Sequence, residues 1–335
     1  MTIVARYALS AGAATALLAG CGAPQSPIGA LGALPQSRAP VTENRSWMDA
    51  NARKWDLLYV ANDNGTVTVY RYFNRQLVGT LTGFNILRGE CVDKEGNVFI
   101  TDAGSSKVFE YAHGDREPLN VISEGKDEPN GCSVDPVTNK LAVANSAYSS
   151  PGNIAVYNAA GKLLHTYSMA KYFYRPLACA YDDRSDLFAT GTIGSTDSYF
   201  AELAKRSATF IGVRLLPSET NSSWDFVQSI QWDGKYVEVG EDSAYRFAIT
   251  RLGGSRFEGV TSLNGQSSQQ ESWVTNFSGR PDKQGTQIVA AGGEGTGRGT
   301  GSVMYWKYPA GGAPIASITD GIFYPWGVAV SLKQK

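Results

Sequence analysis

Three features of the 335-residue sequence predict an all-β fold, a six-bladed β-propeller with four antiparallel strands per blade. A unit of four short strands recurs roughly every 45 residues, which is typical of propeller blades. The 37 glycines, 17 tyrosines and 7 tryptophans favour strands joined by tight turns. The strands left over at the two ends of the chain complete one further unit.

In four of the units the first strand is apolar and ends near an acidic residue: GECVD (89–93), GCSVD (131–135), ACAYD (178–182) and SIQWD (229–233). A short polar turn leads to a second strand, and two more strands follow. The second strands span 97–102, 140–145, 186–191, 235–240 and 287–292. The third span 107–112, 153–158, 199–204, 245–250 and 303–308. The fourth span 118–123, 162–167, 209–214, 256–261 and 314–319.

The number of blades follows from these units. Five complete blades cover 88–123, 129–168, 175–216, 225–264 and 272–320. Three strands remain at the front, at 56–62, 66–72 and 76–82, and one at the back, at 326–331. Together they form a sixth blade. Because this blade joins the two ends of the chain, the ring has none of the free sheet edges that an open array of blades would expose. A seventh blade would need about 45 more residues.

The first 45 residues predict export and a tether. Arg6 precedes an apolar run over 8–18 that is too short to span a bilayer, and Leu18-Ala19-Gly20-Cys21 follows it. This ending resembles the lipobox of bacterial lipoproteins, which implies removal of 1–20 and lipidation of Cys21. The alternative is a plain signal peptide with a chance cysteine. Residues 21–45 are rich in Ala, Gly, Pro and Ser, so we expect the lipidated cysteine and a flexible linker before a domain at 46–335.

The phrases GNVFITDAGSSKVFEYAHG (96–114), GCSVDPVTNKLAVAN (131–145) and WKYPAGG (306–312), with Ser46-Trp47-Met48 ahead of them, carry a second resemblance. They resemble a group of bacterial lipoprotein six-bladed propellers related to NHL-repeat proteins, and distantly the gluconolactonase and streptogramin-lyase propellers. The first group implies the fold and a place in the bacterial cell envelope, facing the periplasm or the exterior, and it implies no reaction.

One face of the ring is expected to carry the ligand site. The loops between blades and between second and third strands open on this face, and they are rich in aromatic and polar residues. Such a mixture is typical of a mouth for a small molecule or a sugar. The alternative is that the rings pack between blades. The candidate residues are Arg88, Tyr172, Tyr174, Arg175, Trp224, Tyr324 and Trp326.

Catalysis has weaker support. The sequence has no GxSxG elbow, CxxC or HExxH motif, and neither His113 nor His165 is placed as a base near the channel, so no catalytic residue is assigned. The alternative is a metal-dependent hydrolase or lyase of the lactonase type, with a divalent ion at Glu90, Asn130 and Asp102. No other cofactor is expected.

Cys91, Cys132 and Cys179 all lie in first strands. Cys132 and Cys179 share one repeat position in adjacent blades, and Cys91 is one position out of register. An exported chain permits disulfides. A Cys132–Cys179 bridge and three separate buried thiols are both open interpretations.

The balance of 30 basic and 31 acidic residues gives no basic face for nucleic acid. We therefore expect a lipid-anchored, monomeric binding module outside the cytoplasm, more a binder than an enzyme. The expected partners are the membrane, through the anchor, and a small molecule, a glycan or an envelope protein.

Overall fold

The computed structural model describes residues 45–147, 151–193, 197–213, 227, 229–240, 243–250, 254–265, 271–276, 286–292 and 301–334. The chain divides into residues 1–42 and 43–335, and the described residues all belong to the second unit. The predicted leader, Cys21 and the linker as far as residue 44 lie outside them. Within the described ranges, no helix has both the length and the apolar character needed to cross a membrane.

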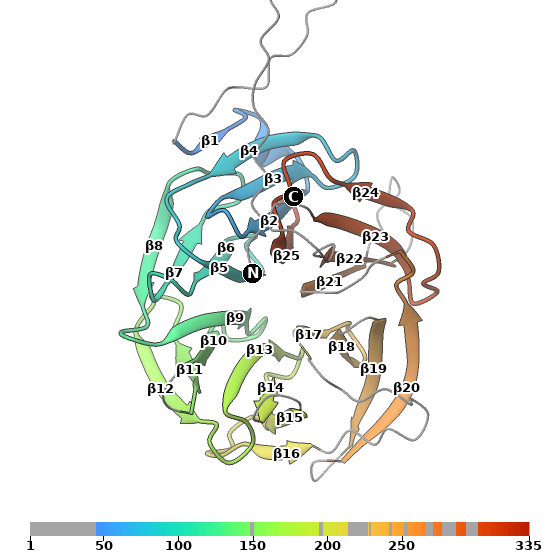
Figure 1. Cartoon of the computed structure of the whole chain (residues 1–335). Helices are drawn as coiled ribbons and strands as arrows, with labels where there is room; N and C mark the ends of the chain where they lie inside the picture. Colours follow the sequence, from blue (N-terminus) through green and yellow to red (C-terminus); the bar gives the residue numbers. More distant parts are fainter. Residues whose placement is uncertain are drawn as a thin grey trace, which may run out of the picture. The chain divides into compact units, whose positions relative to one another are not determined.

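The unit at 43–335 is a six-bladed propeller, as the sequence predicts. Figure 1 shows its six sheets in a ring, with β25, β5, β9, β13, β17 and β21 innermost. Each sheet is antiparallel, and consecutive strands step outward from the axis. This order confirms the repeat of four strands.

The strands of blades 2 to 4 have these bounds. Blade 2 contains β5 (Leu87–Val92), β6 (Val98–Asp102), β7 (Lys107–Tyr111) and β8 (Pro118–Ser123). Blade 3 contains β9 (Glu128–Val134), β10 (Leu141–Ser146), β11 (Asn153–Tyr157) and β12 (Leu163–Ser168). Blade 4 contains β13 (Arg175–Tyr181), β14 (Leu187–Ile193), β15 (Asp197–Leu203) and β16 (Ile211–Val213).

Blades 5 and 6 repeat the pattern. Blade 5 contains β17 (Ser229–Trp232), β18 (Val237–Gly240), β19 (Ser243–Thr250) and β20 (Gly254–Ser262). Blade 6 contains β21 (Glu271–Asn276), β22 (Thr286–Gly292), β23 (Ser302–Tyr308) and β24 (Ala316–Ile318).

Blade 1 closes the ring in the predicted way. The C-terminal strand β25 (Pro325–Ser331) pairs with β2 (Leu57–Asn62), and Val60 lies opposite Val328. The sheet continues outward through β3 (Val67–Arg71) and β4 (Leu77–Leu81). A fifth strand, β1 (Trp47–Met48), pairs with β4 and covers its outer edge. The sequence does not predict this strand. A short 3-10 helix, η1 (Ala52–Lys54), leads into β2.

The core lies between blades, and strand alternation explains it. Leu57, Tyr59 and Ala61 of β2 pack in one cluster with Val98 and Ile100 of blade 2. The alternate residues of β2, Leu58 and Val60, pack in another cluster with side chains of blade 6. Successive side chains of a strand point to opposite faces, so a strand between two neighbouring blades is apolar along its whole length.

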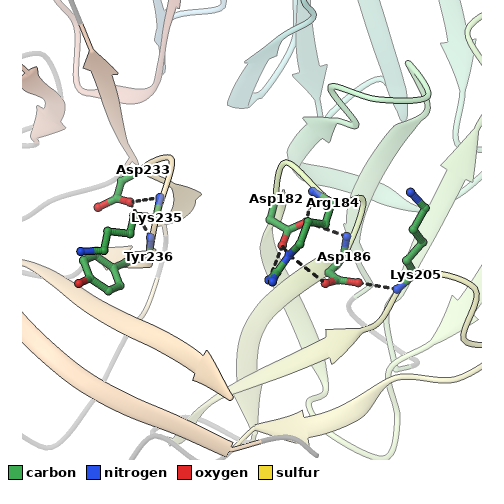
Figure 2. A network of polar contacts seen from close by, with 7 residues as sticks. All are labelled: Asp182, Arg184, Asp186, Lys205, Asp233, Lys235 and Tyr236. Carbon is green, nitrogen blue, oxygen red and sulfur yellow. Dashed lines mark hydrogen bonds and ion pairs between the residues drawn. The ribbon is translucent and has the colours of Figure 1, made fainter. Parts of the chain in front are cut away.

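In blades 2 to 5, the aspartate that follows the first strand accepts hydrogen bonds from the turn of the hairpin. Asp182 Oδ1 accepts the backbone N–H groups of Arg184 and Asp186, at 2.8 and 2.9 Å. Asp233 Oδ1 accepts those of Lys235 and Tyr236, at 2.8 and 2.7 Å, and Figure 2 shows the two turns together. These turns define the hairpin face of the ring, and they are the ordinary turns that the sequence predicts.

The cysteines pair differently from either expectation. Cys91 and Cys132 form a disulfide, with Cα atoms 5.6 Å apart, and Cys179 lies outside the bridge. The predicted Cys132–Cys179 bridge is therefore wrong, and so is the interpretation of three separate thiols.

The direction of the side chains explains the pairing. Cys132 Sγ lies 3.8 Å from Phe99 O, in the preceding blade, and Cys179 Sγ lies 3.6 Å from Ala142 O, again in the preceding blade. Equivalent positions thus face the same way around the ring and do not meet. Cys91 lies one position further along its strand, so it faces the following blade and reaches Cys132.

Candidate functional site: the channel mouth

A β-bulge begins the first strand of four blades, on the face opposite the hairpins. The register shifts between Ala61 and Asn62 where β2 pairs with β25, and at the matching points of blades 2, 3 and 4. A bulge adds one residue and redirects its side chain. The added residue occupies one repeat position around the axis: Trp326, Arg88, Asn130 and Leu177. We call these four residues the channel mouth.

Two members of the channel mouth touch across neighbouring blades. The Arg88 guanidinium lies over the Trp326 ring, 4.2 Å from its centroid. Trp326 Nε1 donates a hydrogen bond to Asp63 Oδ1, at 3.0 Å, and Tyr324 packs edge-on against the indole at 5.6 Å between centroids. A cation over an indole ring contributes about 0.5–2 kcal/mol of attraction, and the contribution is larger where water is excluded. The indole is therefore held on several sides, and it remains half-buried.

The turn before Trp326 is strained and tightly fixed. Tyr324 has a φ of +48°, a left-handed conformation that side chains other than glycine adopt rarely. Asn62 Oδ1 accepts the N–H of Phe323 at 2.9 Å, and the Asp63 N–H donates to Phe323 O at 3.0 Å. A Cβ on Gly301 would lie 2.4 Å from Pro325 Cδ, so only glycine fits there. Backbone strain of this kind is common where a side chain is positioned for binding.

The other predicted face residues lie elsewhere. The Tyr172 hydroxyl donates to Phe210 O, and its ring packs against the cluster between blades 3 and 4, so it follows the packing alternative. Tyr174, on the connection into blade 4, is 38% exposed, and Arg175, the first residue of β13, is half-buried. Both lie two blades from Arg88. Trp224 lies outside the described residues. The structure thus joins Arg88, Tyr324 and Trp326, and it packs the half-buried Tyr172 against the core between blades 3 and 4.

The residues proposed for a metal have other surroundings. Asp102 accepts hydrogen bonds from the N–H groups of Asn85 and Ile86 and from Ser105 Oγ. Both of its carboxylate oxygens are therefore engaged in hydrogen bonds to the neighbouring loops. Glu90 is fully buried. Asn130 belongs to the channel mouth, and its Nδ2 donates to Glu128 O. Within the described part of the chain, no group of three or more His, Cys, Asp or Glu is arranged to hold a metal.

A cavity of about 210 Å³ lies at the other end of the first strands. Its walls include Val92, Ser133, Tyr181 and Trp232, together with the two bridged cysteines. The walls are largely apolar, and the carboxylate of Glu90 is buried beside them. The described residues that line this cavity include no lysine or arginine, in contrast to the mouth.

His113 is more buried than the sequence suggests. Its Nδ1 lies 2.6 Å from Ser331 Oγ and its Nε2 lies 3.0 Å from Trp55 O, at the hairpin face where blade 2 meets blade 1. Burial lowers the pKa of this imidazole. It lies far along the strands from the mouth and links the two blades. His165 is exposed on β12.

Part of the site escapes sequence reasoning. Arg88, Tyr324 and Trp326 are predicted from the sequence because they are aromatic or charged residues on the expected face. Asp63, which follows a second strand on that face, is not among the predicted residues. Leu177 and the shared level of the four mouth residues are missed, because a bulge leaves no clear mark in the sequence.

The sequence matches no protein-family model, and no curated protein matches it. Solved structures do match in fold. A protein of unknown function from Bacteroides caccae has a TM-score of 0.57 at 12% identity, over 83% of this chain and 99% of that one. A chain of a nidogen/laminin complex has a TM-score of 0.62 at 13% identity, over 84% of this chain and 99% of that one. At these identities the comparisons establish the six-bladed propeller fold.

Proposed function

We propose that this protein is a lipid-anchored, extracytoplasmic binding module whose ligand sits on the channel mouth. The observation that carries the proposal is the setting of Trp326, whose indole contacts Arg88, Asp63 and Tyr324 after a strained turn. An aromatic platform beside a few polar groups is the usual composition of a binding site.

The chemistry of the mouth favours a carboxylate-bearing glycan. An indole face stacks on the apolar face of a sugar ring, and a guanidinium pairs with a carboxylate through two parallel hydrogen bonds. The side-chain amide of Asn130, in the neighbouring blade, both donates and accepts, as sugar hydroxyls require. An envelope protein with an acidic segment has similar chemistry. The similar chain in a nidogen/laminin complex is, by its description, part of an assembly of proteins.

The proposed location in the cell envelope depends on the first 21 residues. Two or more acyl chains on Cys21 would anchor the protein stably, since each buried CH₂ contributes about 0.8 kcal/mol. Mass spectrometry of the protein purified from membranes tests this step. We expect a mature chain that begins at a diacylglyceryl Cys21, and release from the membrane for Cys21→Ser. A mature chain that begins elsewhere would contradict the anchor and leave the mouth untouched.

Binding is tested by a thermal-shift screen with peptidoglycan fragments, uronic acids and neutral sugars. A ligand at 100 times its Kd stabilises the fold by about 2.7 kcal/mol, which is measurable as a rise in Tm. We expect a shift with acidic glycans that is lost in Trp326→Ala and weakened in Arg88→Lys. Tyr174→Ala, on the same face but two blades away from Arg88, is the matched control and should keep the shift.

If no sugar shifts Tm, we expect an envelope protein to co-purify with the wild-type chain and not with Trp326→Ala. A partner or sugar that binds both proteins equally would contradict the assignment of the mouth. Retained binding after EDTA treatment distinguishes this function from a metal-dependent enzyme.

A further inference from the structure

The outer edge of a propeller blade is a free sheet edge, and this ring treats its edges differently. The outermost strand of a sheet presents unpaired backbone N–H and C=O groups to any extended chain that approaches it. Proteins protect such edges with a covering strand, a short edge strand, a proline or charged side chains. In blade 1 the edge of β4 is covered, because β1 of the same chain pairs with it.

β12, the outermost strand of blade 3, has none of these protections, and Figure 1 shows it at the rim of the ring. Among the other outer strands, β8 begins with Pro118, β16 and β24 have three residues each, and β20 carries Arg256 and Glu258. β12 has six residues, LLHTYS, with no proline, lysine, arginine or acidic residue. Its Leu163 and Leu164 are 49% and 47% exposed. This edge is therefore open to the addition of a strand.

The register of blade 3 shows which backbone groups face the open edge. The Met169 N–H donates to Gly152 O at 3.2 Å, so this pair is a hydrogen-bonded pair of the ladder between β11 and β12. Hydrogen-bonded and non-hydrogen-bonded pairs alternate along an antiparallel ladder. Thr166, which lies opposite Ala155, belongs to the second kind. Its N–H and C=O are consequently turned away from β11 and toward the free edge.

A groove of about 370 Å³ lies beside β12, between this strand and residues 208–210 of blade 4. Two aromatic rings line it, since Tyr167 packs edge-on against Phe210 at 5.5 Å between centroids. Tyr172 also lines the groove, and its hydroxyl donates to Phe210 O. The volume falls in the range of about 300–1,000 Å³ that is usual for binding pockets. The groove can therefore take an apolar side chain.

The charge of the groove is positive. The described residues that line it include Lys171 and His165 and no acidic residue. Lys171 is exposed, and its Nζ lies 5.2 Å from the centroid of the Tyr172 ring. Lys205 and Arg206, which precede the wall at 208–210, are exposed as well. A carboxylate complements such a surface, because a charge-assisted hydrogen bond to an ammonium group is stronger than a neutral one.

We propose that an extended, acidic segment of a partner protein adds to β12 as a fifth strand of blade 3. Its backbone pairs with Thr166. An apolar side chain of the segment lies in the groove against Tyr167 and Phe210, and a carboxylate pairs with Lys171. In this mode of recognition the backbone hydrogen bonds give affinity and the groove gives selectivity. β1 uses the same mode within the chain when it pairs with β4. The site lies on the rim and is independent of the channel mouth.

The test begins with selection from a display library of random twelve-residue peptides on the purified full-length chain. The Kd of each selected peptide, synthesised with a fluorophore, is then measured by fluorescence polarisation. We expect peptides with alternating apolar residues and at least one Asp or Glu. Thr166→Pro removes the edge N–H and no ladder hydrogen bond to β11, and it should weaken binding about tenfold or more. Thr166→Ala keeps the N–H and is the matched control.

Charge reversal gives a second, independent readout. Lys171→Glu should weaken binding of the acidic peptides, whereas Lys307→Glu, at an exposed position of blade 6, should not. Lys171→Glu decides the question if Thr166→Pro fails to fold, which circular dichroism would show. Trp326→Ala should leave this binding unchanged, which separates the rim from the mouth.

The proposal is wrong if the library yields no binding peptide, or if the selected peptides bind Thr166→Pro and Lys171→Glu as tightly as the wild type. The competing explanation is that the exposed leucines and lysines rest on a membrane. A Cys21→Ser chain that binds no peptide but sediments with vesicles of phosphatidylethanolamine and phosphatidylglycerol, and loses this binding in Lys171→Glu, would make the rim a membrane contact and overturn the proposal.

Discussion

The Cys91–Cys132 disulfide should be a major source of stability, because it links adjacent blades across 41 residues of chain. Closing a loop of that length removes about 4 kcal/mol of conformational entropy from the unfolded state at 25 °C. For a domain of this size, that difference corresponds to a loss of about 8 °C in Tm. The perturbation is the double variant Cys91→Ala, Cys132→Ala.

The assay is differential scanning calorimetry without reductant. Cys179→Ala is the control, because it also removes a buried sulfur but breaks no bridge. Thiol titration in denaturant, with Cys21 replaced by serine, should count one thiol in the parent chain. A double variant that melts with the control, or a count of three thiols, would refute the pairing.

Two further predictions follow from the same geometry. Ser133 holds in blade 3 the position of Cys91, and its Oγ accepts the Tyr181 N–H of blade 4 at 2.9 Å. Ser133→Cys should therefore form a second bridge with Cys179, detected as the loss of the last thiol, and a persistent thiol would count against it. Burial lowers the pKa of His113 below its usual 6.5, so the unfolded chain binds this proton more readily. The free energy of unfolding should therefore fall as pH drops below about 6.5. Chemical denaturation at pH 5.5 and 8 measures this fall, and His113→Asn should remove the part that comes from His113. If the variant keeps the same pH dependence, another group than His113 takes up the proton.

The fold is predictable because the same pattern of four strands recurs several times along the sequence. In blades 2 to 5 the first strand is followed by an aspartate whose carboxylate closes the hairpin, as Asp182 and Asp233 do, so the period of the blades is visible. The closure follows by counting strands. The edge strand at Trp47–Met48 is not predictable in this way, since two residues form no period and their pairing depends on the exposed edge of β4.

The site is predictable only in part, for a different reason. Sequence position places Arg88 and Trp326 on one face, yet their contact depends on bulges that add one residue to the first strands of blades 1 and 2. The cysteine pairing fails for a related reason. Equal repeat positions suggest proximity, but side chains at equal positions point the same way around a ring, and only an odd offset such as that of Cys91 brings two together.

The most direct test of the channel mouth is site-specific photocrosslinking in cells that express the full-length chain. A photoreactive amino acid would replace Trp326 in one variant and Arg184, exposed on the hairpin face, in the other. We predict an adduct with a glycan or an envelope protein from position 326 and none from position 184. An adduct from position 184 alone, or equal adducts from both, would contradict the mouth as the binding surface.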